Sequence, residues 1–192
     1  MTGGLSFNES VTPLGHFHDA SHFTAGMALY IKNLGIVVSF RGTVPTSLDN
    51  WLMNLNIRCT PFYYGGCIHA GWQTTTVSLA DGVFDVIRSG LLIDPDSTIF
   101  FTGHSLGGAL ATIFATHLVA AGWLPHCVQL YTFGQPRVGD AAFVKTVDKL
   151  GFGRYRLTHF KDPVPHLPFL SLGYRHFTRE LWFDEKNKSL PY

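Results

Sequence analysis

One serine in the chain has the neighbours of an activated nucleophile. Ser105 is the centre of the pentapeptide GHSLG, residues 103–107, which fits the pattern G-x-S-x-G. In that pattern a tight strand-to-helix turn exposes the serine hydroxyl, and the next backbone N–H points to a developing oxyanion. A phosphate-binding loop is excluded, because it needs a lysine after its glycines, where this chain has Leu106 and Ala109.

Two further residues have the types and positions that ester hydrolysis would need. Thr43 directly follows the apolar run "IVVSFRG" and offers an N–H and a hydroxyl as a second oxyanion donor. Asp162 follows the run "RYRLTHF", and Pro163 stops that strand, so a carboxylate is expected just beyond a strand end. The alternatives are a turn threonine and an ordinary Asp-Pro turn.

The elements that must position these residues alternate between strands and helices. Residues 23–31 and 36–40 read as a hairpin, and residues 97–101, 127–134, 154–160 and 179–183 as further strands. Helical spacing marks residues 47–57, 74–90 (with Val77, Phe84, Ile87 and Leu91 near one stripe) and 139–151. Residues 106–124 have the length of a membrane span, but a helix buried under a sheet has the same composition. The alternation predicts an α/β fold, a mostly parallel sheet with helices on both faces.

Composition bounds the class of protein. A chain of 192 residues, 46% apolar and 14% charged, suits a single domain over residues 1–192 with a large core. Fourteen basic residues against thirteen acidic ones give no reason to expect a nucleic-acid partner. No cofactor or metal site is expected. Cys59 and Cys67 bracket a short loop and are as plausible a disulfide as a free pair, and Cys127 reads as a buried small hydrophobe.

Six motifs resemble, in order, those of the class 3 (fungal-type) triacylglycerol lipases. They are "SFRGT", "NWLMNLN", "IHAGW", "TGHSLGGALA", "TFGQPRVGD" and "RLTHFKDPVPHLP", and the resemblance runs from about residue 24 to 184. It implies an α/β-hydrolase fold, with Ser105 as nucleophile, Asp162 as triad acid, and Thr43 and Leu106 as oxyanion donors.

The resemblance also implies a lid over residues 44–57. The apolar residues there have the spacing of an amphipathic helix, as a lid requires: Leu48, Trp51, Leu52 and Leu55. The alternative is a plain core helix. In such enzymes the lid covers the serine and moves aside at a lipid surface.

A triad also needs a histidine base, and the chain has ten histidines. His104 is expected to point into the packing and His159 to be buried on its strand. His16, His18 and His22 have metal-ligand spacing, but nothing else in the chain completes a site. His176 is the alternative base, but it precedes the strand at 179–183 and so lies at the wrong end of the sheet.

The base is therefore expected beyond residue 192. The family comparison favours a domain incomplete at both ends, whose isolated 192 residues would be nearly inactive and would leave apolar surface uncovered beside the last strands.

The expected function is a secreted triacylglycerol lipase of lipid catabolism, acting at an oil–water interface, with no transmembrane segment. The N-terminus itself shows no signal-peptide pattern. A phospholipase or a feruloyl-type esterase of the same fold is an alternative. A non-catalytic lipid-binding protein that has lost its base is another.

Overall fold

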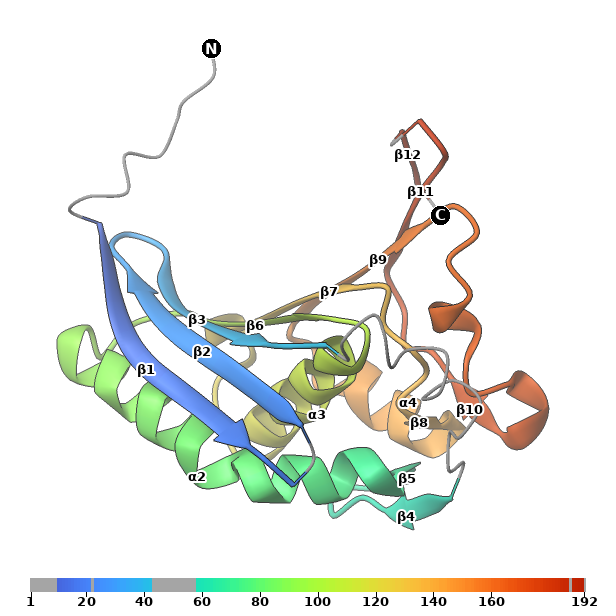
Figure 1. Ribbon diagram of the computed structural model, residues 1–192, viewed down its shortest axis with the longest axis horizontal. Helices are drawn as coiled ribbons and strands as arrows, with labels where there is room; N and C mark the ends of the chain where they lie inside the picture. Colours follow the sequence, from blue (N-terminus) through green and yellow to red (C-terminus); the bar gives the residue numbers. More distant parts are fainter. Residues whose placement is uncertain (1–9, 22, 43–57, 187, 192) are drawn as a thin grey trace.

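A sheet of eight strands forms the centre of the molecule, in the order β1-β2-β3-β6-β7-β9-β11-β12 (Figure 1). The computed structural model describes residues 10–21, 23–42, 58–186 and 188–191. Five neighbouring strands run parallel, and antiparallel strands flank them on both sides. The parallel strands are β3 (Gly35–Phe40), β6 (Ile99–His104), β7 (Val128–Phe133), β9 (Gly153–His159) and β11 (Glu180–Phe183).

The predicted hairpin is confirmed as β2 (Thr24–Ile31) paired with β3. The turn between the two strands needs residues with positive φ. Asn33 and Gly35 meet this need, with φ values of 65° and 124°. The sequence did not indicate β1 (Val11–Asp19), because only one of its residues, Phe17, is fully buried. The opposite edge of the sheet is β12 (Ser189–Pro191).

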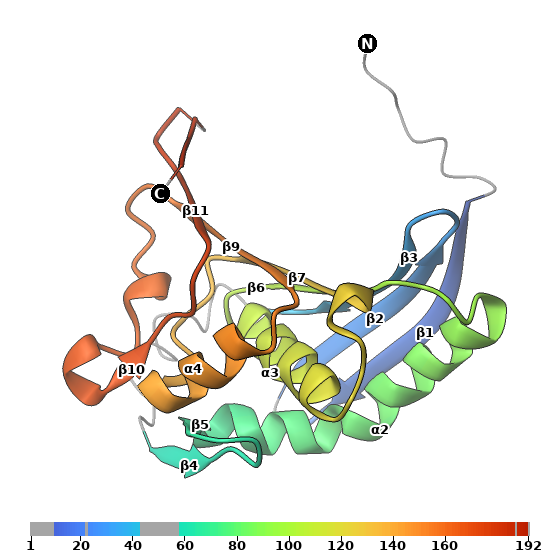
Figure 2. The same ribbon diagram turned by 180° about the vertical axis from the view of Figure 1, so that it is seen from behind.

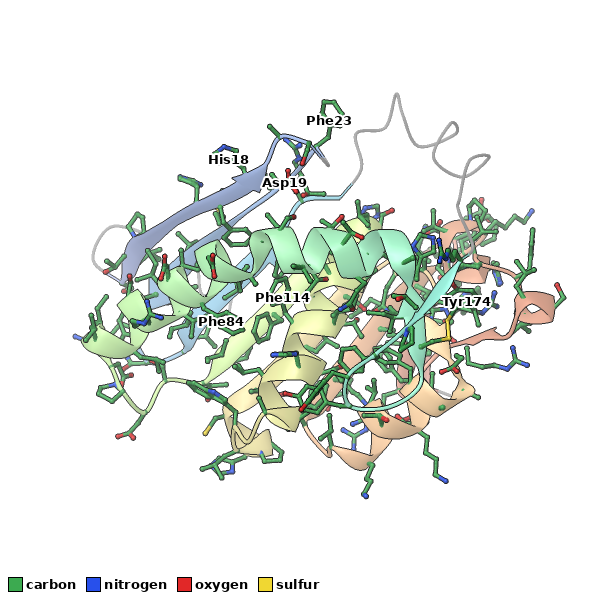
Figure 3. All side chains as sticks on the ribbon, turned by 90° about the horizontal axis from the view of Figure 1, so that it is seen from below. His18, Asp19, Phe23, Phe84, Phe114 and Tyr174 are labelled. Carbon is green, nitrogen blue, oxygen red and sulfur yellow. A yellow bond between two sulfur atoms is a disulfide. The ribbon has the colours of Figure 1, made fainter. Side chains whose placement is uncertain are left out.

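The helices α2 (Ala70–Ile93), α3 (Leu106–Ala120) and α4 (Ala141–Lys149) lie on one face of the sheet, as both ribbon views show (Figures 1 and 2). The Phe114 ring of α3 stacks on Phe40 of β3, with 5.1 Å between ring centroids. Between α2 and α3, Phe84 approaches Phe114 edge-on (Figure 3). The α/β architecture and its parallel centre are thus confirmed, and the helices of the described residues cover one of the two faces.

Helix α2 begins earlier than predicted, and the predicted stripe is confirmed only in part: Ile87 is buried, and Phe84 and Leu91 pack against the core. Val77 was expected inside but is 66% exposed. The buried stripe runs beside Gly82 and Gly90, where the helix backbone comes so close to Phe17 and Ile36 that a Cβ would lie within 3 Å of their side chains. The spacing of apolar residues could not locate this stripe, because the helix comes closest to the sheet at glycines, which the apolar pattern does not include.

The apolar run after Ser105 is a core helix. Almost every side chain of α3 is buried against the sheet and α2, which accounts for its composition. Within residues 10–21, 23–42, 58–186 and 188–191, no helix has both the length and the hydropathy to cross a membrane.

The sheet face away from the helices carries partly exposed apolar side chains. Met27 of β2, and Tyr131 and Phe133 of β7, are 36–44% exposed there. Strand alternation explains this, since Val128, Leu130 and Thr132 of β7 point to the helices and are buried. We call this surface the open face.

A smaller sheet, β10-β8-β5-β4, lies beside the N-terminal end of α2. Its strands are β4 (Cys59–Pro61), β5 (Cys67–His69), β8 (Gly139–Asp140) and β10 (Tyr174–Arg175). A disulfide joins Cys59 to Cys67 across the β4–β5 hairpin, with 5.6 Å between the Cα atoms. Cys127, in the single turn η1 (Pro125–Cys127), is a free, half-buried thiol.

Candidate active site

Ser105 occupies the strained turn that the sequence predicted. It follows β6 directly and precedes the first residue of α3, with φ of 54° and ψ of −123°. A positive φ is unusual for a residue with a side chain and costs on the order of 1–3 kcal/mol. The turn is fixed by backbone bonds: the Ser105 N–H donates to Phe133, and its carbonyl accepts from Gly108 and Ala109.

Two glycines allow this turn to exist. A Cβ at Gly103 would lie 2.3 Å from the carbonyl carbon of Gly107, and one at Gly107 would lie 2.2 Å from the carbonyl oxygen of Phe40. Both neighbours are backbone atoms, which cannot rotate away. The glycines of the G-x-S-x-G pattern are therefore steric requirements of the elbow.

One of the two expected oxyanion donors, Leu106, directly follows the serine. Leu106 is the first residue of α3, so its N–H has no partner within the helix. Gly42, at the end of β3, packs against the elbow: its Cβ position lies 3.6 Å from the Ser105 Cβ and 2.6 Å from the His104 carbonyl oxygen. Thr43 comes next in the chain but lies outside the described residues, as do all of the lid residues Leu48, Trp51, Leu52 and Leu55.

Asp162 lies beyond the carboxyl end of β9, as expected, and is half-buried. Its Oδ1 accepts the N–H of Val164 at 3.0 Å. Its Oδ2 faces Gly134, where a Cβ would lie only 2.7 Å away. One carboxylate oxygen is thus held by its own turn, and the other is turned toward the loop that follows β7.

A cavity of about 180 Å³ opens beside the carboxylate. It is lined by residues that follow or end parallel strands: His104, Phe133, Gly134, Leu157, Thr158, His159, Asp162 and Phe183. A water molecule occupies about 30 Å³ of liquid, so the cavity has room for a ring the size of imidazole.

Two sequence expectations about histidines were wrong. His104 does not point into the packing, and His159 is not buried; both are exposed and line the cavity with Asp162. The reason is the same for each. Alternation along β6 and β9 turns Phe101 and Thr158 toward the helices, and it turns the last residue of each strand toward the open face.

Of the three N-terminal histidines, the structure describes two. His16 and His18 are exposed on β1, and His22 lies outside the described residues. Across the part of the chain that the structure describes, no three His, Cys, Asp or Glu side chains are grouped to hold a metal ion.

His176 lies just before the N-terminal end of β11, which is parallel to β9. Its Nε2 is 2.8 Å from the carbonyl oxygen of Pro165. That oxygen can only accept, so Nε2 carries the hydrogen. The described residues include no hydrogen bond from His176 to Ser105 or Asp162.

Burial lowers the pKa of His176 to about 3, and the neighbouring positive charges of Arg156, Arg137 and His166 also lower it. The hydrogen bond to Pro165 raises the pKa, but its effect is smaller than that of burial. The imidazole is therefore neutral at the pH of ordinary assays.

Sequence reasoning missed Gly134 and Arg137, which belong to the same loop after β7. Gly134 has φ of 54° and leaves room for both the Asp162 carboxylate and the His104 ring. Arg137 is buried and donates to the carbonyls of His166 and Pro168. The glycine at the end of the predicted strand 127–134 was the local signal for this loop.

Comparisons with known proteins identify the family of the chain. The sequence profile of the family described as lipase (class 3) matches residues 37–172. The chain belongs to the class 3 lipases.

Related proteins of this family are longer than the chain. The secreted mono- and diacylglycerol lipase 1 of Fusarium solani is 38% identical over 151 residues, which are 78% of this chain and 44% of that protein. The chain spans about half the length of the curated relatives it matches.

Solved class 3 lipases have the same fold. The triacylglyceride lipase of Rhizomucor miehei superposes with a TM-score of 0.87 at 27% identity, covering 95% of this chain and 70% of that one. A second structure, at TM-score 0.82 and 27% identity, covers 91% of this chain and 67% of its own. It is described as a triacylglycerol lipase whose catalytic centre is a serine protease triad. The central sheet with its helices is thus that of the α/β-hydrolase lipases.

The elbow predicts a sharp difference between two adjacent glycines. Gly107→Ala should lower the free energy of unfolding by about 1–3 kcal/mol or more, because its Cβ meets the Phe40 backbone. Gly108→Ala is the matched control, since its nearest contact is 3.1 Å and alanine favours the helix. Urea unfolding measures both variants, and equal losses would contradict the steric argument.

His176 predicts a loss of stability in acid. Its pKa is near 6.5 in the unfolded chain and about 3 in the folded one, so the unfolded state binds more protons between these values. Its contribution is complete above pH 6.5 and is lost as the pH falls toward 3. Between pH 7.5 and 5.0, the parent should lose about 2 kcal/mol more than His176→Gln, as measured by urea unfolding. The exposed His126→Gln is the control, and a variant with the parent's full acid sensitivity would refute the prediction.

Proposed function

We propose that the protein is a serine ester hydrolase that acts on acylglycerols. The observation that carries this proposal is the Ser105 elbow after β6, with Asp162 beyond the carboxyl end of β9, two strands along in the same sheet. In this mechanism the Ser105 hydroxyl attacks the ester carbonyl and forms an acyl-enzyme, which water then hydrolyses.

The oxyanion of the tetrahedral intermediate would be bound by two backbone N–H groups. Leu106 contributes one from the free N-terminus of α3, and we assign the other to Thr43. The contact of Gly42 with the elbow supports this assignment, because it brings the chain to the serine one residue before Thr43.

We assign the base to a histidine outside the described residues, in the cavity next to Asp162. Asp162 and Gly134 both line that cavity, the Asp162 Oδ2 lies beside Gly134, and its Oδ1 is already held by Val164. His176 is a poor candidate, because its Nε2–H is committed to Pro165 and its pKa is about 3. A general base works best with a pKa near the operating pH.

The substrate is proposed to be presented at an oil–water interface, with residues 44–57 as a lid. The apolar spacing of Leu48, Trp51, Leu52 and Leu55 supports this, since a lid needs one apolar face. We also propose that the protein is secreted. The Cys59–Cys67 disulfide supports an oxidising compartment, and the Fusarium solani relative is named as secreted.

The nucleophile can be tested directly in the full-length protein. Ser105→Ala should lower ester hydrolysis by about 10⁴-fold or more, because covalent catalysis is lost. Ser171→Ala, an exposed serine in the single turn η3 (Leu170–Leu172), is the control and should keep full activity. Hydrolysis of a chromogenic short-chain ester measures both. Activity within about tenfold of the parent in Ser105→Ala would overturn the proposed mechanism.

The lid assignment predicts a difference between two physical forms of substrate. Trp51→Ser with Leu52→Ser should reduce hydrolysis of an emulsified triacylglycerol about tenfold or more, and that of a soluble ester far less, because apolar contact with the interface is lost. Tyr63→Ser removes an aromatic side chain that is 89% exposed outside the lid, and it should change neither rate. Equal losses on both substrates would place residues 48–55 in the core instead.

A further inference from the structure

Four successive carbonyl groups after Asp162 are held by two distant residues. The carbonyl oxygen of Pro165 is 2.8 Å from the His176 Nε2. Arg137 donates hydrogen bonds to the next three carbonyls. Its guanidinium donates to the carbonyl of His166 and, at 2.7 Å, to that of Pro168. Its backbone N–H donates to the carbonyl at position 167, also at 2.7 Å.

This segment depends on outside donors because of its sequence. Residues 162–168 read DPVPHLP, and prolines have no N–H to donate. The single turn η2 (Val164–His166) is the only regular structure in it. Buried carbonyls need partners, so the side chains that supply them decide where the segment lies.

The position of the Pro165 carbonyl is coupled to the Asp162 carboxylate through one residue. Val164 is buried, and its N–H donates to the Asp162 Oδ1 at 3.0 Å. Val164 is also the residue whose peptide bond leads to Pro165. A shift of the Pro165 carbonyl would therefore move the N–H that orients the carboxylate toward the cavity.

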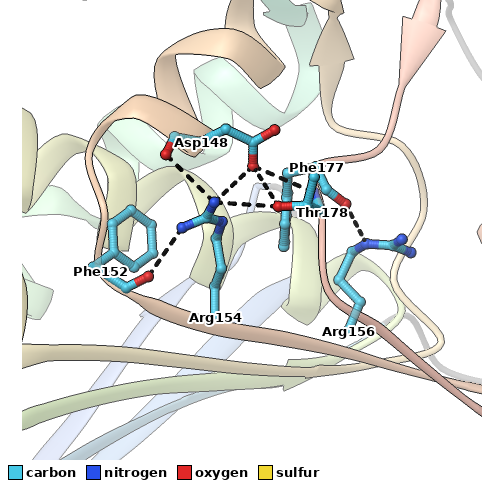
Figure 4. Close-up of polar contacts among 6 residues, drawn as sticks. All are labelled: Asp148, Phe152, Arg154, Arg156, Phe177 and Thr178. Carbon is cyan, nitrogen blue, oxygen red and sulfur yellow. Dashed lines mark hydrogen bonds and ion pairs between the residues drawn. The ribbon is translucent and has the colours of Figure 1, made fainter. Parts of the chain in front are cut away.

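His176 is itself held firmly by the residues that follow it. Figure 4 shows Arg154 and Asp148 meeting at the Thr178 hydroxyl, with Arg156 donating to the Phe177 carbonyl at 3.2 Å. The Arg154–Asp148 ion pair is 2.8 Å long, and the Arg154 side chain is 8% exposed. A donor anchored in this way can fix the backbone that it contacts.

We propose that His176 is a positioning residue for the catalytic acid, acting through the Pro165 carbonyl on the Asp162 turn. The proposal rests on the proposed function, in which Asp162 orients the base. His176 has a neutral imidazole as donor, and it takes no part in proton transfer to substrate.

The experiment compares two amides at position 176 in the full-length protein. His176→Gln can place its Nε2–H where the imidazole Nε2–H lies, whereas the shorter His176→Asn cannot reach Pro165. We expect His176→Asn to lower kcat about 10- to 100-fold with KM little changed, since a displaced catalytic group costs rate. His176→Gln should recover most of that loss. Active-site titration with an acyl phosphonate gives kcat per folded molecule, so partial misfolding of either variant does not enter the comparison.

Two further readouts separate positioning from general stability. In an Asp162→Ala background, His176→Asn should have almost no effect on kcat, because there is no carboxylate left to orient. In the Asp162 protein, His176→Asn should also move the acid limb of kcat/KM to lower pH, because an imidazolium without its carboxylate loses its proton more readily.

The possible results distinguish failure of the positioning role from failure of the proposed function. If Asp162→Ala is inactive but His176→Asn keeps its kcat and pH profile, the positioning role is wrong and the proposed function stands. The same holds if the loss in His176→Asn persists undiminished in the Asp162→Ala background, which would mark a purely structural residue. If Asp162→Ala keeps the parent's activity, the acid assignment fails and the positioning proposal fails with it.

Discussion

The positive φ of Ser105 is the constraint on which the rest of the structure depends. A residue with a side chain keeps this strained conformation only where its surroundings fix it. Three backbone segments do so: the end of β3 at Phe40, the end of β6 at Gly103 and the first turn of α3 at Gly107, at separations that exclude any Cβ. The parallel pairing of β3 with β6 and the burial of α3 beneath them are what keep these segments together.

Asp162, the proposed acid, is held by a different kind of interaction. The elbow is fixed by backbone contacts, whereas the N–H groups of the proline-rich turn after Asp162 satisfy its carbonyls at positions 163 and 164, and the next four depend on outside donors. Arg137 and His176 supply the donors from 25 residues before Asp162 and 14 residues after it. Both donors are nitrogen groups shielded from solvent, and burial lowers the pKa of Arg137 as well as that of His176. The proposed positioning of the acid buries several nitrogen groups, of which the Arg137 Nε and the His176 Nδ1 have no hydrogen-bond partner among the described residues.

Local rules predicted the parts of the site that local sterics determine. The elbow at Ser105 and the strand end before Asp162 follow from glycine and proline, whose effects act within a few residues. The orientations of His104 and His159 were wrong, because they depend on which face of the sheet the helices cover, and that is decided by distant segments. The sequence contains no signal for the hydrogen bond between His176 and Pro165, because any polar side chain near the strand could have donated to that carbonyl. The Cys59–Cys67 pairing was undecided in the sequence for the same reason: spacing permits it, and only the β4–β5 hairpin brings the sulfurs together.

The open face and the candidate site are parts of one surface. Phe133 and His104 point away from the helices, and both line the cavity beside Asp162. Parallel strands are normally covered on both faces, and Tyr131 and Phe133 are more than a third exposed on this one. A segment that packs on Phe133 would also lie beside the cavity, because Phe133 is part of its lining. A histidine on such a segment would reach the Asp162 carboxylate from the side that Val164 leaves free. Burial of the open face and completion of the triad then become a single packing event, so the free energy of that contact would stabilise the sheet and place the base at the same time.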